Sequence, residues 1–263
     1  KTTFNMRRLP LFLFSAIALT FLILPMLALI IRAISDSAWD ALLAPAVTSA
    51  LWLSLWTSAL SIALIFIFGT PLAYTLARYK FWGRRAVLVI ITTPIVLPPA
   101  VAGLALLLTF GRNGIFGDWL RDYNIRIAFT TVAVVMAQIF VSAPLYIRSA
   151  VAGFMGIPQD IQEAARVDGA GGWALFWWVI LPLSARALLA GMVLTWARAV
   201  GEFGATIFFA GGVGGRTQTM PLLIYQLFET DLDATILSGV VLMVVAMLAL
   251  MIAQTLSHER AVW

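Results

Sequence analysis

Six long apolar segments constrain the fold of this chain more than any other feature. They lie near residues 10–31, 50–77, 86–109, 128–152, 187–210 and 234–257. An α-helix rises about 1.5 Å per residue, so each segment is long enough to cross a hydrocarbon core of roughly 30 Å. Hydrophobic residues make up 62% of the chain and charged residues 11%, and a soluble globule of this size has too little interior to bury so much apolar surface. The sequence predicts an all-α, polytopic integral membrane protein in the lipid bilayer, with six transmembrane helices in one domain, residues 1–263.

The first apolar segment follows Lys1, Arg7 and Arg8, as the apolar region of a secretory signal peptide would. It is longer than such a region and ends without a clear small-x-small cleavage site, so we expect a retained span. Because the sequence begins at Lys1 rather than Met, we expect its start to be trimmed or processed.

The positive charges predict the orientation. With the N-terminus inside, eleven of the 17 Lys and Arg residues fall in inside segments and five in outside loops, and Arg198 falls in a span. Cytoplasmic loops of membrane proteins carry an excess of Lys and Arg, so both termini are predicted to be cytoplasmic. The net charge of +5 then reflects topology, and no nucleic acid is expected as a partner. Two loops are long, a cytoplasmic loop at 153–186 and an external loop at 211–233.

Residue types exclude most chemistry within the chain. There is no cysteine, and His258 is the single histidine, so we expect no disulfide, no metal site, no catalytic residue and no bound cofactor. The glycine run Gly211–Gly215 lacks the lysine of a phosphate-binding loop and does not lie between a strand and a helix. We therefore expect no ATP site in this chain.

The cytoplasmic loop contains the pattern of a short helix after Pro158. Acidic residues near the start suit a helix N-terminus, and Gly169 suits its end. Small and apolar residues recur at helical spacing on one face. They are Ile161, Ala164 and Ala165, followed by Asp168. This periodicity fits a helix lying flat on the bilayer and a docking helix for a cytoplasmic partner equally well.

A longer pattern separates these two interpretations. Glu163-Ala164-Ala165, then Gly169, then Val179-Ile180-Leu181-Pro182 resembles the EAA loop of ABC-importer permeases, with Val179 in place of the usual Ile. The resemblance implies the type I importer fold and a coupling helix seated on a cytoplasmic ABC ATPase subunit, which would hold the ATP and Mg. The residues that it assigns to this coupling loop are Asp160, Glu163, Ala164, Ala165, Asp168 and Gly169.

Arg198 and Glu202 fall near the middle of the predicted span 187–210. A charge at the bilayer centre costs about 2.5–3.5 kcal/mol on insertion scales, so such residues usually face a bundle interior or a water-filled cavity. Their i, i+4 spacing allows them to pair along one helix face. A structural ion pair and a polar path for a solute both remain open, and we favour the path.

A second resemblance narrows the family. The stretches Trp196–Thr206 and Gly215–Leu222 resemble the molybdate and tungstate permease branch. Sulfate permeases share the Gly-Glu-aromatic-Gly core but fit Arg216–Thr219 less well. Gly211–Gly215 departs from the Gly-Asn-x-Pro-Gly of many members.

The resemblance also implies that the third and fifth spans line the translocation path. Pro98 and Pro99 interrupt the third span and release backbone groups that neighbours or water must satisfy. This interruption is either a tolerated kink or a gate or wall of the path, and the resemblance favours the path. The residues assigned to the path or gate are Thr92, Thr93, Pro98, Pro99, Arg198, Glu202, Phe203 and Thr206.

Together these features predict the membrane subunit of an ATP-driven importer for molybdate or tungstate. We expect a homodimer, an external substrate-binding protein and partner ATPases. A sulfate or thiosulfate permease is the nearest alternative. A stand-alone secondary transporter or channel would need coupling acids in several spans, and Glu202 is the one clear intramembrane acid. A membrane enzyme would need clustered His, Cys or carboxylates.

Overall fold

The computed structural model describes residues 9–33 and 44–257, and in those ranges it contains helices and no strands. The long helices are α1 (Leu9–Ala33), α3 (Pro45–Arg78), α7 (Thr131–Met155), α10 (Leu181–Val200) and α13 (Leu232–Ser257). The shorter ones are α4 (Arg84–Val96), α5 (Pro99–Phe110), α6 (Gly117–Asp122), α8 (Gln159–Val167), α9 (Gly172–Ala174), α11 (Gly204–Phe209) and α12 (Met220–Leu227). Five helices of the described ranges are long and apolar enough to span a membrane, or six if α4 and α5 count as one bent span. The predicted all-α membrane architecture is confirmed.

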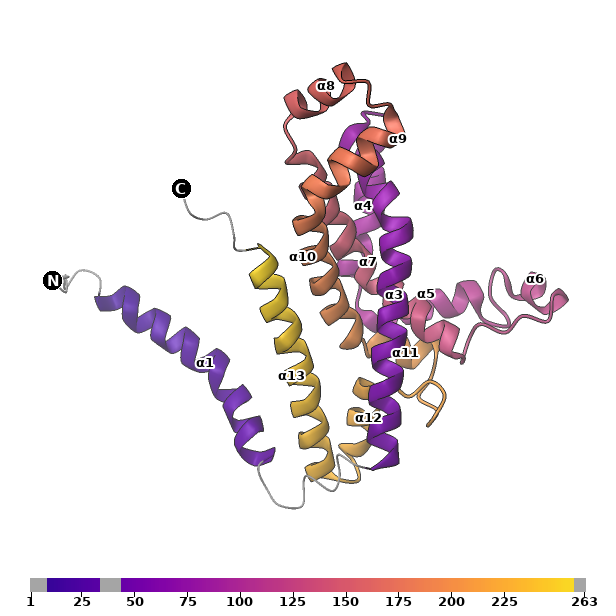
Figure 1. Cartoon of the computed structure of the whole chain (residues 1–263). Helices are drawn as coiled ribbons and strands as arrows, with labels where there is room; N and C mark the ends of the chain where they lie inside the picture. Colours follow the sequence, from indigo (N-terminus) through magenta and orange to yellow (C-terminus); the bar gives the residue numbers. More distant parts are fainter. Residues whose placement is uncertain (1–8, 34–43, 258–263) are drawn as a thin grey trace.

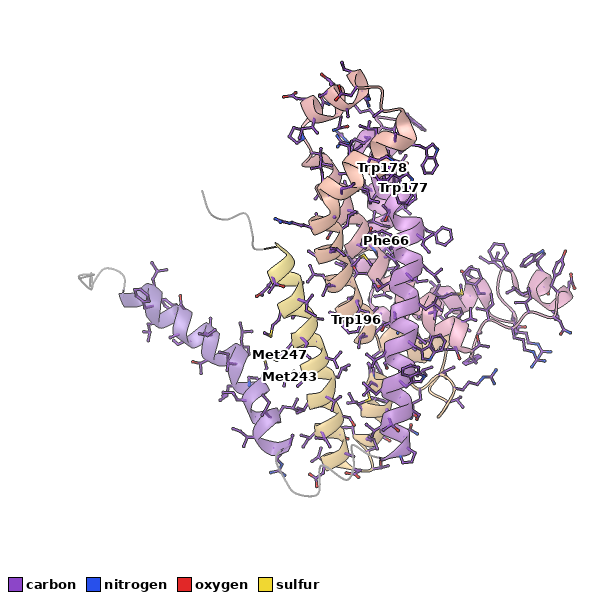
Figure 2. The ribbon with its side chains drawn as sticks, viewed as in Figure 1. Phe66, Trp177, Trp178, Trp196, Met243 and Met247 are labelled. Atoms are coloured by element: carbon purple, nitrogen blue, oxygen red, sulfur yellow. The ribbon has the colours of Figure 1, made fainter. Side chains whose placement is uncertain are left out.

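The centre of the bundle is formed by α3, α7 and α10, and α13 packs along α10 (Figure 1). Aliphatic and aromatic side chains of α3 and α7 form its main apolar cluster, which includes Leu76, Tyr146 and Phe154. By contrast, α1 stands away from the bundle in Figure 1, and no residue in its most apolar window is buried. Met243 and Met247 of α13 lie on the side that faces α1 (Figure 2).

A stripe of small hydroxyl side chains runs down the buried face of α3. It consists of Ser54, Thr57, Ser58 and Ser61. Ser61 Oγ donates to Gln138 Oε1 of α7 at 2.9 Å. The indole N–H of Trp196, labelled in Figure 2, donates to Ser58 Oγ at 2.9 Å. Apolar contact gives little preference between alternative helix registers in lipid, so these bonds fix how α3, α7 and α10 line up.

The third predicted span, 86–109, is two helices rather than one. Between α4 and α5 the axis turns by 115°. Pro98 and Pro99 have no backbone N–H, and a residue before proline avoids the helical region, so Leu97 and Pro98 adopt extended ψ values of 135° and 132°. The turn is far larger than an ordinary proline kink.

The fifth predicted span, 187–210, is shifted toward the N-terminus. The continuous helical segment runs from Gly172 to Val200, so the predicted loop 153–186 ends earlier than expected. Residues Leu175–Ile180 form a π-helical turn, and Leu181 N–H donates to the Phe176 carbonyl five residues back. The predicted end of this span, at residue 210, was too late because apolar residues continue past Val200. In the structure α10 ends at Val200 with Gly201 as its C-cap, and a turn up to residue 203 leads into α11.

Candidate functional site

The predicted coupling loop forms α8, which caps one end of the bundle between α7 and α9 (Figure 1). Pro158 is the N-cap of the helix, and Asp160 lies in its first turn. Glu163, Ala164 and Asp168 are exposed, whereas Ala165 is half-buried. The coupling-loop residues are therefore brought together on one short helix at the edge of the molecule.

The predicted small-residue face of α8 is divided between two sides. Gln162 is buried and Ala165 packs toward the main apolar cluster. Ile161 is 41% exposed and Val167 is 87% exposed, on either side of the exposed Ala164. An apolar side chain with this much exposure at the end of a bundle has a surface free for a partner. The outward face of α8 is thus Ile161, Ala164 and Val167, with Glu163 beside it.

Gly169 ends α8, as its position predicts. Its φ is +90°, and the amide of Ala170 donates back to the Ala165 carbonyl at 2.9 Å. This is a Schellman-type helix end, which requires a left-handed residue and therefore favours glycine.

Arg78 is a residue that sequence reasoning missed. It ends α3, and its Nη2 donates to the Phe154 carbonyl at the end of α7 at 2.6 Å. Turned with its oxygen toward the guanidinium, the Gln162 amide accepts from Arg78 Nη1 and Nη2 at 2.8 and 2.9 Å. One guanidinium therefore joins α3, α7 and α8. The only signal in the sequence was an arginine at the end of an apolar span. Such an arginine is equally expected from the excess of positive charge on the cytoplasmic side.

The Arg198–Glu202 ion pair forms as its spacing predicts, at 2.6 Å between Nη1 and Oε2. Arg198 lies in the last turn of α10, within the spanning segment Gly172–Val200, and Glu202 lies just past the end of the helix at Val200. Glu202 Oε1 also accepts from the Ala205 amide at 2.8 Å, at the N-terminus of α11. The Glu202 side chain is 1% exposed and that of Arg198 is 35% exposed. The carboxylate is thus fully engaged, while the arginine keeps one open side.

Other predicted path residues gather where α5 meets α11. A Cβ on Gly204 would lie 2.5 Å from Pro99 Cβ, and a Cβ on Gly103 would lie 2.6 Å from the Ala205 carbonyl oxygen. Phe203 stacks at a tilt against Tyr225 of α12, with ring centroids 5.2 Å apart. The interruption at Pro98 and the turn after α10 therefore form one contact.

The remaining path candidates are placed differently. Thr92 and Thr93 lie on α4, on the other side of the bend, and donate to carbonyls one turn back in their own helix, Leu88 and Val89. Thr206 is buried in α11, and its hydroxyl has no hydrogen-bond partner. The structure brings Pro99 together with the turn that holds Glu202 and Phe203, but it does not bring Thr92 and Thr93 to that contact.

The metal and phosphate-loop interpretations can also be compared with the structure. Within them, no group of three or more His, Cys, Asp or Glu side chains could hold a metal ion. The loop after α11 reverses at Gly211 and Gly215, with φ values of +71° and +72°, and it follows a helix rather than a strand. The arrangement places the short exposed helix α8 at one end and a bent, closely packed contact within the bundle.

Comparison with known proteins gives consistent results. Residues 67–262 match the family model described as "Binding-protein-dependent transport system inner membrane component". The chain is 40% identical over 233 residues to the molybdenum transport system permease protein ModB of Mycobacterium tuberculosis, covering 89% of this chain and 88% of that one. It is 38% identical over 217 residues to the sulfate transport system permease protein CysW of Synechococcus elongatus, covering 80% and 76%.

The fold is also found in solved transporters. A bacterial ABC transporter that imports alginate superimposes with a TM-score of 0.76 at 19% identity, covering 97% of both chains. Its complex with an alginate-bound periplasmic protein gives a TM-score of 0.72 at 20% identity, covering 97% of this chain and 96% of that one. The matched family model and the long curated alignments lead to one conclusion: this multi-pass chain belongs to the inner-membrane permease subunits of binding-protein-dependent ABC importers.

Proposed function

We propose that this permease conducts a tetrahedral oxyanion, molybdate or tungstate, into the cytoplasm. The observation that carries the proposal is the 40% identity to a molybdenum permease over 89% of the chain. A sulfate or thiosulfate importer is the second candidate, because a sulfate permease is 38% identical over 80% of the chain.

The proposed assembly has two copies of this chain, two cytoplasmic ABC ATPases and an external binding protein. The alginate transporter that shares the fold was solved with a periplasmic protein, which supports such a partner here. We propose that the ATPases dock on the outward face of α8, with both permease termini in the cytoplasm. ATP binding would close the ATPases and swing the permease chains from an inward-open to an outward-open state.

The cargo is tested by titrating the binding protein encoded with this permease, then measuring uptake. We expect molybdate and tungstate to bind and to be carried into vesicles that contain the whole importer, with sulfate at least tenfold weaker. Tight binding and uptake of sulfate with no response to molybdate would select the second candidate.

Replacing Glu163 with Ala or Gly169 with Ala tests the role of α8. Glu163 is exposed, so its loss should leave the fold intact and weaken docking alone. At Gly169 an added Cβ meets nothing within 4 Å, but the φ of +90° disfavours any side chain, so the helix end should shift at a cost of about 1–2 kcal/mol.

We expect both variants to insert into the membrane and to import less anion per ATP hydrolysed. Gly171→Ala, where a Cβ also meets nothing within 4 Å and the φ is ordinary, is the matched control. Full transport by both variants would remove the coupling role from α8.

A further inference from the structure

Four arginines surround one cavity beside the bundle. The cavity has a volume of about 530 Å³, and Arg112, Arg121, Arg126 and Arg216 line it. The first three come from the segment between α5 and α7, and the fourth comes from the much later connection between α11 and α12. We call this cavity with its four arginines the cationic basin.

A cluster of arginines is unexpected on the side of the membrane where the predicted topology places this basin. Positive residues are disfavoured on the outer side of a membrane protein, and the predicted topology leaves five arginines in outside loops. Four of those five line the basin. Arg112, Arg121 and Arg126 are close in the sequence, but Arg216 is brought to them by the fold.

The acidic residues nearby do not neutralise the basin. Asp118 forms an ion pair with Arg121. Within the described ranges, no acidic side chain is recorded as an ion-pair partner of Arg112, Arg126 or Arg216, and no acid lines the cavity. Counting Asp118 and Asp122 of the same segment against the four arginines leaves a net charge of +2. A concave surface with unpaired charges of one sign concentrates ions of the opposite sign.

Hydrogen bonds hold the two walls of the basin together. Thr131 Oγ1 donates to the Arg216 carbonyl at 3.0 Å, and the Phe129 amide donates to the Phe209 carbonyl at 3.1 Å. Phe129 has a φ of +60°, a strained conformation for a bulky side chain that persists only where surrounding contacts enforce it. The arginines therefore project from a fixed rim.

The chemistry and size of the basin indicate a hydrated anion. Guanidinium groups match the oxygens of an oxyanion and bind them with charge-assisted hydrogen bonds. A water molecule occupies about 30 Å³, so a cavity of about 530 Å³ holds a small anion together with its water. All four arginines are exposed, so retention would be weak and rapidly reversible, as a site on a transport route requires.

We propose that the cationic basin is a transient holding site for the oxyanion at the outer mouth of the permease. It retains the anion between release from the binding protein and entry into the path. The assignment rests on the proposed oxyanion import and adds a second anion site, on this chain. Docking of an acidic face of the binding protein is a different use of the same arginines, and the test below separates the two.

The first test measures anion imported per ATP hydrolysed, using the complete importer in vesicles with molybdate as cargo. The test variant is Arg112→Gln with Arg126→Gln and Arg216→Gln. The same three positions changed to Lys keep the charge, and Arg32→Gln removes a predicted outside arginine that does not line the cavity.

In the Gln variant we expect about a tenfold fall in molybdate imported per ATP, the lower end of the effect of charged clefts on local ion concentration. ATP hydrolysis stimulated by the binding protein should be unchanged. The Lys variant should retain most transport, and Arg32→Gln should resemble the native chain. Unchanged transport per ATP overturns the proposal. A rise in the binding-protein concentration needed for half-maximal ATP hydrolysis also overturns it, because the arginines would then dock that protein.

The second test uses the native chain, so it does not depend on the folding of a variant. Phenylglyoxal modifies accessible arginines, and mass spectrometry reads each site. Millimolar molybdate or sulfate should slow modification of Arg112, Arg126 and Arg216 but not of Arg32, and equal modification with and without anion overturns the proposal. If the binding protein takes up no oxyanion, the proposed cargo fails, whereas this protection measurement still reports on the basin.

Discussion

At the scale of single residues, Glu202 is held at both of its carboxylate oxygens. One carboxylate oxygen pairs with Arg198, and the other accepts a hydrogen bond from the Ala205 amide in the first turn of α11. The side chain is 1% exposed, so it cannot exchange either partner for bulk water. Arg198 is what makes a buried negative charge tolerable at the end of α10.

Replacing Arg198 with Ala should therefore harm the chain more than replacing both members of the pair. The single change leaves a buried carboxylate without its cation, and removing one partner of a buried pair costs about 3–5 kcal/mol. Because Arg198 is 35% exposed, we expect roughly half of that cost. The double variant Arg198→Ala with Glu202→Gln keeps an acceptor for Ala205 and removes the stranded charge.

The measurement is thermal unfolding of the purified permease in detergent, with Glu202→Gln as the second single variant. We expect the double variant to melt above Arg198→Ala. Losses that simply add would show that the two side chains do not act as a pair.

At the scale of elements, the contact between α5 and α11 depends on two glycines. The atoms closest to an added Cβ are the Ala205 carbonyl oxygen at Gly103, 2.6 Å away, and Pro99 Cβ at Gly204, 2.5 Å away. Backbone and ring atoms of this kind cannot rotate aside. The bent helix pair and the turn after α10 therefore move as one body or separate altogether.

Gly103→Ala should destabilise the permease by about 1–3 kcal/mol, the usual cost of overpacking a filled interface. Gly172→Ala is the matched control, because a Cβ there meets nothing within 4 Å. Both proteins would be compared by thermal unfolding and by uptake. Equal melting temperatures would contradict the close contact at Gly103.

Elements whose ends are set by local chemistry could be predicted from the sequence. Gly169 ends α8 through its own backbone freedom, and Pro98 with Pro99 must interrupt a helix. The 115° angle at that interruption could not be predicted, because it depends on where α11 lies. The predicted end of the fifth span was wrong because apolar residues continue past Gly201. Hydrophobicity alone does not distinguish a spanning helix from a buried turn.

Site residues divide in the same way. Glu163 and Gly169 were assigned to the coupling loop through the resemblance to the EAA loop, whereas the Arg198–Glu202 pair was predicted from its i, i+4 interval. The bond from Arg78 to Phe154 and the cationic basin join residues that are distant in the sequence. The stripe of Ser54, Thr57, Ser58 and Ser61 was not predicted from the sequence, although its hydroxyls recur at helical spacing, and the partner Gln138 lies far away in the sequence.

At the scale of the whole molecule, one chain does not fully cover two of its helices. No residue of α4 is buried, and the most apolar window of α1 is 0% buried. Lipid can cover apolar side chains, but α4 also carries the exposed Thr93 and leads into the bend, so a protein surface is a better neighbour for it.

We accordingly expect two copies of this chain in each importer. Native mass spectrometry of the complex, extracted gently with its lipids, should give two permease chains and two ATPases. A single permease chain under conditions that preserve other importers would contradict the dimer.

The hydroxyl stripe on α3 also has a consequence for the order of assembly. α3 leaves the ribosome well before α7, so Ser58 and Ser61 must wait in the bilayer without Trp196 and Gln138. Hydroxyl groups are tolerated in the bilayer during that time because they can donate hydrogen bonds to carbonyls of their own helix, as Ser61 does to the Thr57 carbonyl at 2.8 Å. A charged group in the same place could not be satisfied in this way. Each interhelical hydrogen bond that forms later contributes only about 0.6 kcal/mol on average. A misaligned pair of helices can therefore separate and pack again in another register. The stripe thus tolerates the delay between the synthesis of α3 and that of its partner helices, and it still selects one final alignment.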